Sequence, residues 1–131
     1  MIAVDTSVLV RYVTQDDHDQ SQRANSFFET ELSERNPGYI THLALAEFHW
    51  VLRRKYGFPA TQIGEAIRRL LNVPTLALER PDLVEIALAP EQGDFADRLI
   101  HFVAIDAGCE RTVTFDRKFA RLAGVELLKS E

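Results

Sequence analysis

The 131-residue sequence contains a single cysteine, Cys109, so no disulfide can form within the chain. A chain without internal disulfides is typical of a reducing compartment, and we expect a cytoplasmic protein. The sequence also lacks an apolar run of the length that a membrane-spanning helix needs. Its first residues have neither a basic region nor a long apolar stretch, so we expect no signal peptide.

Basic residues are outnumbered, with 15 Lys and Arg against 20 Asp and Glu and a formal net charge of −5. This balance argues against a protein that coats nucleic acid through bulk charge. It is compatible with an enzyme that gathers carboxylates around a metal ion. The length and the hydrophobic content of 46% suit one globular domain, which we expect to cover residues 1–131.

Short apolar segments alternate with amphipathic ones along the whole chain. We expect strands at residues 2–4, 39–41, 75–78, 111–115 and 125–128, and helices at residues 8–13, 20–32, 42–56, 61–71, 81–89, 94–108 and 117–123. Thr61 is the expected cap of its helix. The alternation predicts an α/β fold in which helices cover a parallel sheet and all strands end at one edge.

The first predicted strand ends at Asp5, which is followed by Thr6 and Ser7. Its continuous apolar pattern is typical of a buried, central strand of a parallel sheet. The carboxyl end of such a strand is where ligands bind in open α/β sheets. The alternative is that Asp5 or Ser7 only caps the following helix, and for this stretch alone the cap is the commoner case.

Asp116 repeats this layout at the end of Thr114-Phe115-Asp116. Asp116 also has an alternative role as the cap of the helix predicted from Arg117. Because parallel strands end at one edge, however, both predicted strands would deliver a carboxylate to the same place.

Glu47 lies on a helical face with large apolar residues such as Trp50. A lone carboxylate on a buried face is costly, which favours a cation beside it. The alternative is a glutamate at the margin of the apolar stripe, or one paired with Arg54.

Asp94 and Asp97 open the long predicted helix and lie on one face of it. Asp94 suits the cap position, where acids are also favoured by the helix dipole. Asp97 is the better candidate for a ligand.

Four carboxylates at one edge cannot all stay ionised without a cation. Oxygen ligands select hard ions, so Mg²⁺ or Mn²⁺ is expected. Such a site suits the hydrolysis of phosphodiester bonds, because the metal activates a water molecule and stabilises charge on the phosphate oxygens.

Five short motifs, in this order, resemble those of one family: Val4-Asp5-Thr6-Ser7-Val8-Leu9, Ala46-Glu47, Asp94-Phe95-Ala96-Asp97, Thr114-Phe115-Asp116 and Gly124-Val125. The chain resembles a PIN-domain ribonuclease, and more narrowly a VapC-type toxin of a bacterial toxin–antitoxin pair. Two positions depart from the pattern. Ser7 stands where many relatives have asparagine, and His101-Phe102 occupies a stretch that is usually small and apolar.

The resemblance implies a PIN-like three-layer α/β/α sandwich with a central, mostly parallel sheet of four to five strands. It implies a Mg²⁺- or Mn²⁺-dependent endoribonuclease whose catalytic and metal-binding residues are Asp5, Glu47, Asp97 and Asp116. Supporting roles would fall to Thr6, Ser7, Asp94 and Thr114. The implied partners are RNA, a cognate VapB-like antitoxin and a second copy of the chain, in the cytoplasm.

Two other functions are compatible with parts of this pattern. A phosphoryl-transfer hydrolase would use Asp5 as its nucleophile, but such enzymes carry a second aspartate where this chain has Ser7. A non-catalytic, receiver-like Mg²⁺-binding module would need paired acids after the first strand and a lysine near the position of Asp116.

Overall fold

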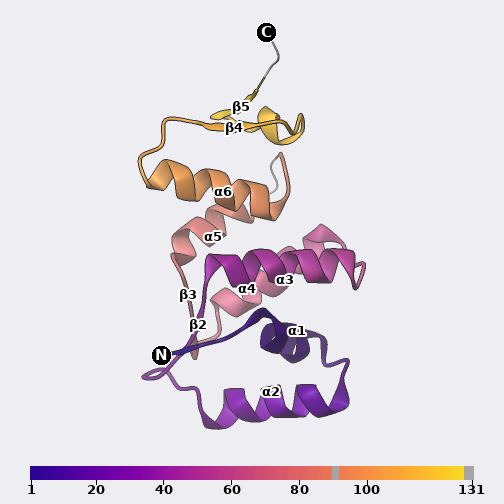
Figure 1. The fold of residues 1–131 in the computed structure, drawn as a ribbon. Helices are drawn as coiled ribbons and strands as arrows, with labels where there is room; N and C mark the ends of the chain where they lie inside the picture. Colours follow the sequence, from indigo (N-terminus) through magenta and orange to yellow (C-terminus); the bar gives the residue numbers. More distant parts are fainter. Residues whose placement is uncertain (90–91, 129–131) are drawn as a thin grey trace. The chain divides into compact units, whose positions relative to one another are not determined.

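The computed structural model of the protein describes residues 1–89 and 92–128. The chain divides into two compact units, unit 1 from Met1 to Pro81 and unit 2 from Asp82 to Glu131 (Figure 1). The expectation of a single domain over residues 1–131 stays a prediction.

Unit 1 alternates strands with helices and contains a three-stranded sheet. Its elements are β1 (Ile2–Ala3), α1 (Thr6–Thr14), α2 (His18–Thr30), β2 (Gly38–Ile40), α3 (His42–Arg54), α4 (Ala60–Leu71) and β3 (Leu76–Leu78). All strand pairs are parallel, in the order β1-β2-β3. Within unit 1, β1 is the first strand of this order and pairs with β2; its predicted central position in the sheet stays a prediction.

Two helices show how apolar spacing fixes the core of unit 1. In α4, residues Ile63, Ile67 and Leu70 are buried at helical spacing, and Arg68 and Arg69 are exposed on the other side. In α3, Phe48 is fully buried, which contributes roughly 2 kcal/mol. The cap predicted at Thr61 is wrong, because Pro59 with its extended backbone precedes the first helical residue and no side chain caps α4.

Gly38 begins β2 in a position where no side chain fits. A Cβ atom at this residue would lie 2.9 Å from Val4 Cγ2 and 3.0 Å from both Leu32 Cδ1 and Leu76 Cδ2. The glycine thus lets the chain after α2 pack closely between β1 and β3.

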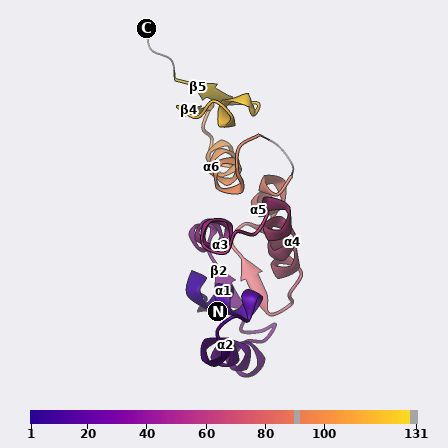
Figure 2. The same cartoon turned by 90° about the vertical axis from the view of Figure 1, so that its right-hand side faces the viewer.

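Unit 2 contains α5 (Pro81–Ala87, beginning at the boundary), α6 (Phe95–Asp106), β4 (Thr112–Thr114), the 3₁₀ helix η1 (Phe119–Arg121) and β5 (Val125–Leu127). Strands β4 and β5 pair in parallel (Figure 2). Phe119, Leu122 and Val125 form a small core against Phe102.

His101 is a core residue of unit 2. Its ring is buried, and Nδ1 lies 2.8 Å from the hydroxyl of Thr112 in β4. A Cβ atom at Gly124 would lie 2.9 Å from His101 Cε1, and Gly124 has a φ of +88°. The imidazole, unexpected in a stretch that is small and apolar in relatives, is accommodated because Gly124 leaves room for it.

The predicted strands and helices all occur in the described residues, with ends that differ by a few positions. The main difference is the last helix, which is a single 3₁₀ turn. Parallel pairing is confirmed, and the five strands form one sheet of three and one of two. Over the ranges that the structure covers, no helix is both long and apolar enough to cross a membrane.

Candidate functional site

Asp5 lies between β1 and α1 and caps α1. Its Oδ2 accepts hydrogen bonds from the backbone N–H of Ser7 (3.1 Å) and the hydroxyl of Ser7 (2.7 Å). The bond from the Ser7 hydroxyl, followed by that from the backbone N–H, lowers the pKa of Asp5 below its usual range. The predicted role of Asp5 as a helix cap is confirmed, and both of these hydrogen bonds are accepted by Oδ2. The exposed carboxylate keeps Oδ1 for another ligand.

Thr6 connects the start of α1 to α3. Its buried hydroxyl lies 3.2 Å from the carbonyl oxygen of Ala44 and 3.2 Å from Oε1 of Glu47. A hydroxyl has one hydrogen, so it donates to one of the two at a time. Among the residues with predicted supporting roles, Ser7 thus bonds to Asp5 through its hydroxyl, whereas the hydroxyl of Thr6 lies beside Glu47.

Glu47 lies on an exposed face of α3. Leu43 and Trp50 on the same face are 74% and 54% exposed, and the side of α3 that faces the core is made by Leu45, Phe48 and Leu52. The argument that burial would force a cation on Glu47 is therefore wrong. The alternative pairing with Arg54 does not occur in the described residues either.

Asp94 and Asp97 form a capping box at the start of α6. Asp94 Oδ1 accepts from the N–H of Asp97 at 2.8 Å, and Asp97 Oδ2 lies 3.5 Å from the N–H of Asp94. The predicted cap at Asp94 is confirmed. Burial raises the pKa of Asp97, and the charges of Asp94 and Asp116 raise this pKa further. These three acids of unit 2 are close enough to repel one another.

Asp116 follows β4, and like Asp5 it accepts hydrogen bonds from the residues just after it in the chain. Its Oδ1 accepts from the N–H groups of Lys118 (2.9 Å) and Phe119 (3.1 Å), and its own N–H donates to the hydroxyl of Thr114 at 3.0 Å. Thr114 thus holds the backbone of Asp116. In both strand-end aspartates one carboxylate oxygen accepts the local hydrogen bonds. Asp5 caps α1, whereas Asp116 bonds to the turn before η1, whose N-cap is Lys118, so the predicted cap at Asp116 is wrong.

Arg98 holds the segment that leads into α6. Its Nε donates to the carbonyl of Ala87 at 2.7 Å, and its Nη1 donates to the carbonyl of Gly93 at 2.5 Å. Gly93 has a φ of +85°, and a Cβ atom there would lie 3.3 Å from Cβ of Asp97. Arg98 therefore fixes backbone carbonyls close to Asp97.

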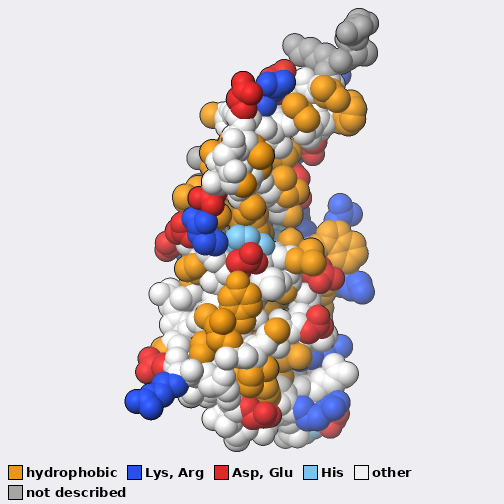
Figure 3. All heavy atoms as spheres, turned by 60° about the vertical axis from the view of Figure 1, so that its left-hand side comes forward, with side chains coloured by type: hydrophobic (Ala, Val, Ile, Leu, Met, Phe, Trp, Pro, Cys, Tyr) orange, Lys and Arg blue, Asp and Glu red, His pale blue; other side chains and the backbone are white. Residues whose placement is uncertain are grey.

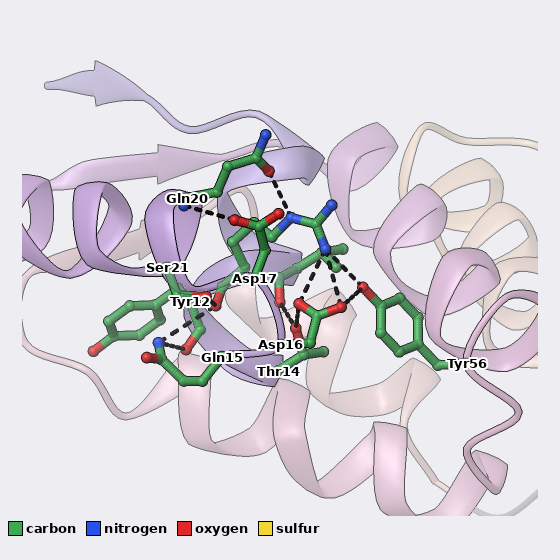
Figure 4. Close-up of polar contacts among 10 residues, drawn as sticks. Tyr12, Thr14, Gln15, Asp16, Asp17, Gln20, Ser21 and Tyr56 are labelled. Carbon is green, nitrogen blue, oxygen red and sulfur yellow. Dashed lines mark hydrogen bonds and ion pairs between the residues drawn. The ribbon is translucent and has the colours of Figure 1, made fainter.

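Sequence reasoning missed a polar network that includes Asp16, Gln20 and Tyr56 (Figure 4). Arg11 makes most of its contacts. Its Nη1 lies 3.0 Å from Asp16 Oδ1 and 3.0 Å from the hydroxyl of Tyr56, and its Nε donates to Gln20 Oε1 at 2.6 Å. Tyr56 donates to Asp16 Oδ2 at 2.6 Å. This bond, with those from Thr14 and Arg11, holds the pKa of Asp16 well below its usual range. The network joins α1 and α2 to the chain after α3.

A cavity of about 490 Å³ in unit 1 extends from the end of β1 to α2. Its lining includes Asp5, Ser7, Arg11, Gln20, Arg23 and Phe27. Hydrophobic side chains also reach the surface, and on the face in Figure 3 they form groups between acidic and basic side chains.

The predicted site residues are distributed over both units. Asp5, Thr6, Ser7 and Glu47 belong to unit 1, whereas Asp94, Asp97, Thr114 and Asp116 belong to unit 2. Neither unit by itself, over residues 1–89 and 92–128, contains three or more His, Cys, Asp or Glu side chains grouped to hold a metal ion. The four-carboxylate metal centre stays a prediction.

Comparisons with known proteins identify the family. No curated protein matches the chain. Among solved structures, it is similar to the crystal structure of Mycobacterium tuberculosis VapC20, a toxin that cleaves the sarcin–ricin loop. The identity is 21%, the match covers 96% of this chain and 98% of that one, and the TM-score is 0.47. The model of the PIN domain matches residues 2–125, nearly the whole chain and across both units. The chain therefore belongs to the PIN-domain family, and the predicted PIN-like α/β fold is confirmed.

Proposed function

We propose that the protein is a metal-dependent endoribonuclease of the VapC type. The observation that carries this proposal is the similar setting of Asp5 and Asp116, each just after a strand, with local hydrogen bonds accepted by one carboxylate oxygen. In a chain of the PIN-domain family, this setting suits two aspartates that bind one ligand.

The donor set fits a hard divalent cation. Asp5, Glu47, Asp97 and Asp116 offer only carboxylate oxygens, which Mg²⁺ and Mn²⁺ prefer. Burial and the charges of Asp94 and Asp116 raise the pKa of Asp97, and a bound cation would offset this cost of its ionised form. When bound, the ion would activate a water molecule and stabilise negative charge on the scissile phosphate.

Hydrogen bonds from the chain's own residues orient three of these carboxylates. Ser7 holds Asp5 in its charged form through two hydrogen bonds. Thr6 fixes the rotamer of Glu47, and Thr114 fixes the backbone of Asp116. Such supporting hydrogen bonds orient ligands before they bind.

The proposed partners follow from the motif order that resembles VapC-type toxins. They are an RNA substrate, a VapB-like antitoxin that neutralises the enzyme, and a second copy of the chain, all in the cytoplasm. The alternative with Asp5 as a phosphorylated nucleophile gains no support, because the Ser7 hydroxyl donates to Asp5 where a second aspartate would be needed.

RNA cleavage by purified protein tests the proposal. With Mn²⁺ the wild type should cleave single-stranded RNA, and EDTA should abolish the activity. Asp5→Asn and Asp116→Asn should lose at least about 100-fold in rate, since each removes a charged ligand at nearly constant volume. Glu65→Gln, which changes an exposed acid on α4, is the matched control and should stay active. Equal cleavage by Asp5→Asn and the wild type would disprove the assignment.

A further inference from the structure

The exposed face of α3 combines an acid, an aromatic ring and a cation in one stripe. Leu43, Glu47, Trp50 and Arg54 follow at spacings of four, three and four residues, which places them on one side of the helix. All four are exposed, and Trp50 is the only tryptophan of the protein. The stripe lies opposite the buried face that holds α3 in unit 1.

Packing within the described structure gives no reason for a tryptophan at position 50. The indole is 54% exposed, and its ring neither stacks on another aromatic ring nor takes part in a hydrogen bond within the described residues. Large aromatic side chains usually bury most of their surface, and when they remain exposed they often mark a binding site.

Positive charge follows Trp50 at the end of α3. Arg53, Arg54 and Lys55 are consecutive and exposed, in a chain whose net charge is −5. Arg53 donates to the carbonyl of Phe58 at 3.3 Å. Arg54 and Lys55 form no ion pair with any acid in the described ranges. Their charge complements the helix dipole and is also available to an anionic partner.

We propose that Trp50 is a stacking platform for a nucleobase of single-stranded RNA and that Arg54 contacts the adjoining backbone. The inference rests on the proposed ribonuclease function. Unpaired bases stack on aromatic side chains without strong sequence preference, while arginine contacts phosphates. The helical rise places Glu47 about 4.5 Å from Trp50 along the axis and about 10 Å from Arg54. A nucleotide stacked on Trp50 would thus be held beside the candidate metal ligand Glu47.

Single-stranded RNA complements the charge at the end of this stripe. Arg54 and Lys55 follow the indole and form no ion pair with an acid in the described ranges, so they can neutralise the phosphates next to a stacked base.

The single tryptophan makes the test direct, because all tryptophan fluorescence comes from Trp50. A single-stranded RNA oligonucleotide, titrated into the wild-type protein in EDTA so that no cleavage occurs, should quench this fluorescence. The anisotropy of the same RNA with a fluorescent label gives the affinity in parallel. Trp50→Leu should weaken binding about 10-fold, and Trp50→Phe should stay within about 3-fold of the wild type, since phenylalanine still stacks. Arg54→Gln should lower the slope of log affinity against log salt by about 1.

Three outcomes would overturn the proposal. The first is equal RNA affinity of Trp50→Leu and the wild type, with both folded by circular dichroism. The second is RNA binding that leaves the fluorescence unchanged. The third is dissociation of a dimer by Trp50→Leu in analytical ultracentrifugation with unchanged RNA affinity per chain, which would assign the stripe to a second copy. If Trp50→Leu and the wild type cleave and bind RNA alike, the proposed role of Trp50 is refuted, but the ribonuclease proposal is not. If the wild type neither binds nor cleaves RNA, the ribonuclease proposal fails as well.

Discussion

The hydroxyl of Thr6 lies 3.2 Å from Oε1 of Glu47, across 41 residues of sequence. It is the contact that connects the segment around Asp5 to the glutamate of α3. The same buried hydroxyl lies 3.2 Å from the carbonyl oxygen of Ala44, so it can donate to the exposed Glu47 or to this carbonyl.

Replacing Thr6 with valine should therefore impair catalysis more than folding. Valine keeps the shape but cannot donate to Glu47, and we expect kcat for RNA cleavage to fall about 10-fold with KM little changed. The loss of stability should be about 1 kcal/mol, as for one hydrogen bond. Thr6→Ser retains the hydroxyl and should restore most of kcat. An inactive Thr6→Ser variant that is fully folded would argue against this role.

Asp97→Asn should separate metal binding from stability. The pKa of Asp97 is raised, so its ionised form opposes folding at pH values above its unfolded pKa, and the amide removes that cost. Without metal, the variant should be at least as thermostable as the wild type. Mn²⁺ should raise the Tm of the wild type and have a smaller effect on the variant. Differential scanning fluorimetry with and without Mn²⁺ measures both, and an equal Mn²⁺ shift in the two proteins would exclude Asp97 as a ligand.

The network around Arg11 predicts a pH dependence of stability. The pKa of Asp16 is lowered, so its contribution is present above the unfolded pKa, about 3.9, and is lost as the pH falls toward the lower folded pKa. Asp16→Asn should be less stable than the wild type at pH 7, and the difference should shrink below about pH 4. Urea unfolding at several pH values tests this, with Asp19→Asn as the control in a more exposed ion pair. A difference that is independent of pH would contradict the prediction.

Gly124→Ala should destabilise unit 2 through contact with His101. An added Cβ would lie 2.9 Å from the imidazole, and the backbone has a φ of +88°. Gly108→Ala is the matched control, because Gly108 has a φ of +99° but nothing within 4 Å of the new atom. Both substitutions should cost roughly 1 kcal/mol of strain, and Gly124→Ala should cost more. Thermal unfolding compares the two. Equal losses of stability in the two variants would show that contact with His101 does not destabilise Gly124→Ala.

The main elements were predictable because they depend on local rules. Apolar runs and helical spacing located the strands and helices of the described residues, and the caps at Asp5 and Asp94 followed from the residues at helix starts. The family was also predictable, since its motifs are short local segments in a fixed order, and the match over residues 2–125 confirms it.

Contacts between distant residues were not predictable in this way. The hydroxyl of Thr6 lies beside Ala44 and Glu47 of α3, 38 and 41 residues away in the chain. The hydroxyl of Tyr56 contacts Arg11 across 45 residues. The face of Glu47 was expected to be buried because it carries Leu43 and Trp50, yet both are exposed.

The sequence by itself determined the order of strands and helices, the family, and the aspartates at the two strand ends. These depend on residues close to one another in the chain. Only the tertiary structure decided which side of α3 is buried, that Thr6 serves Glu47, and that Gly124 makes room for His101. Each of these depends on how side chains from distant segments pack, and a pattern along one segment does not contain that information.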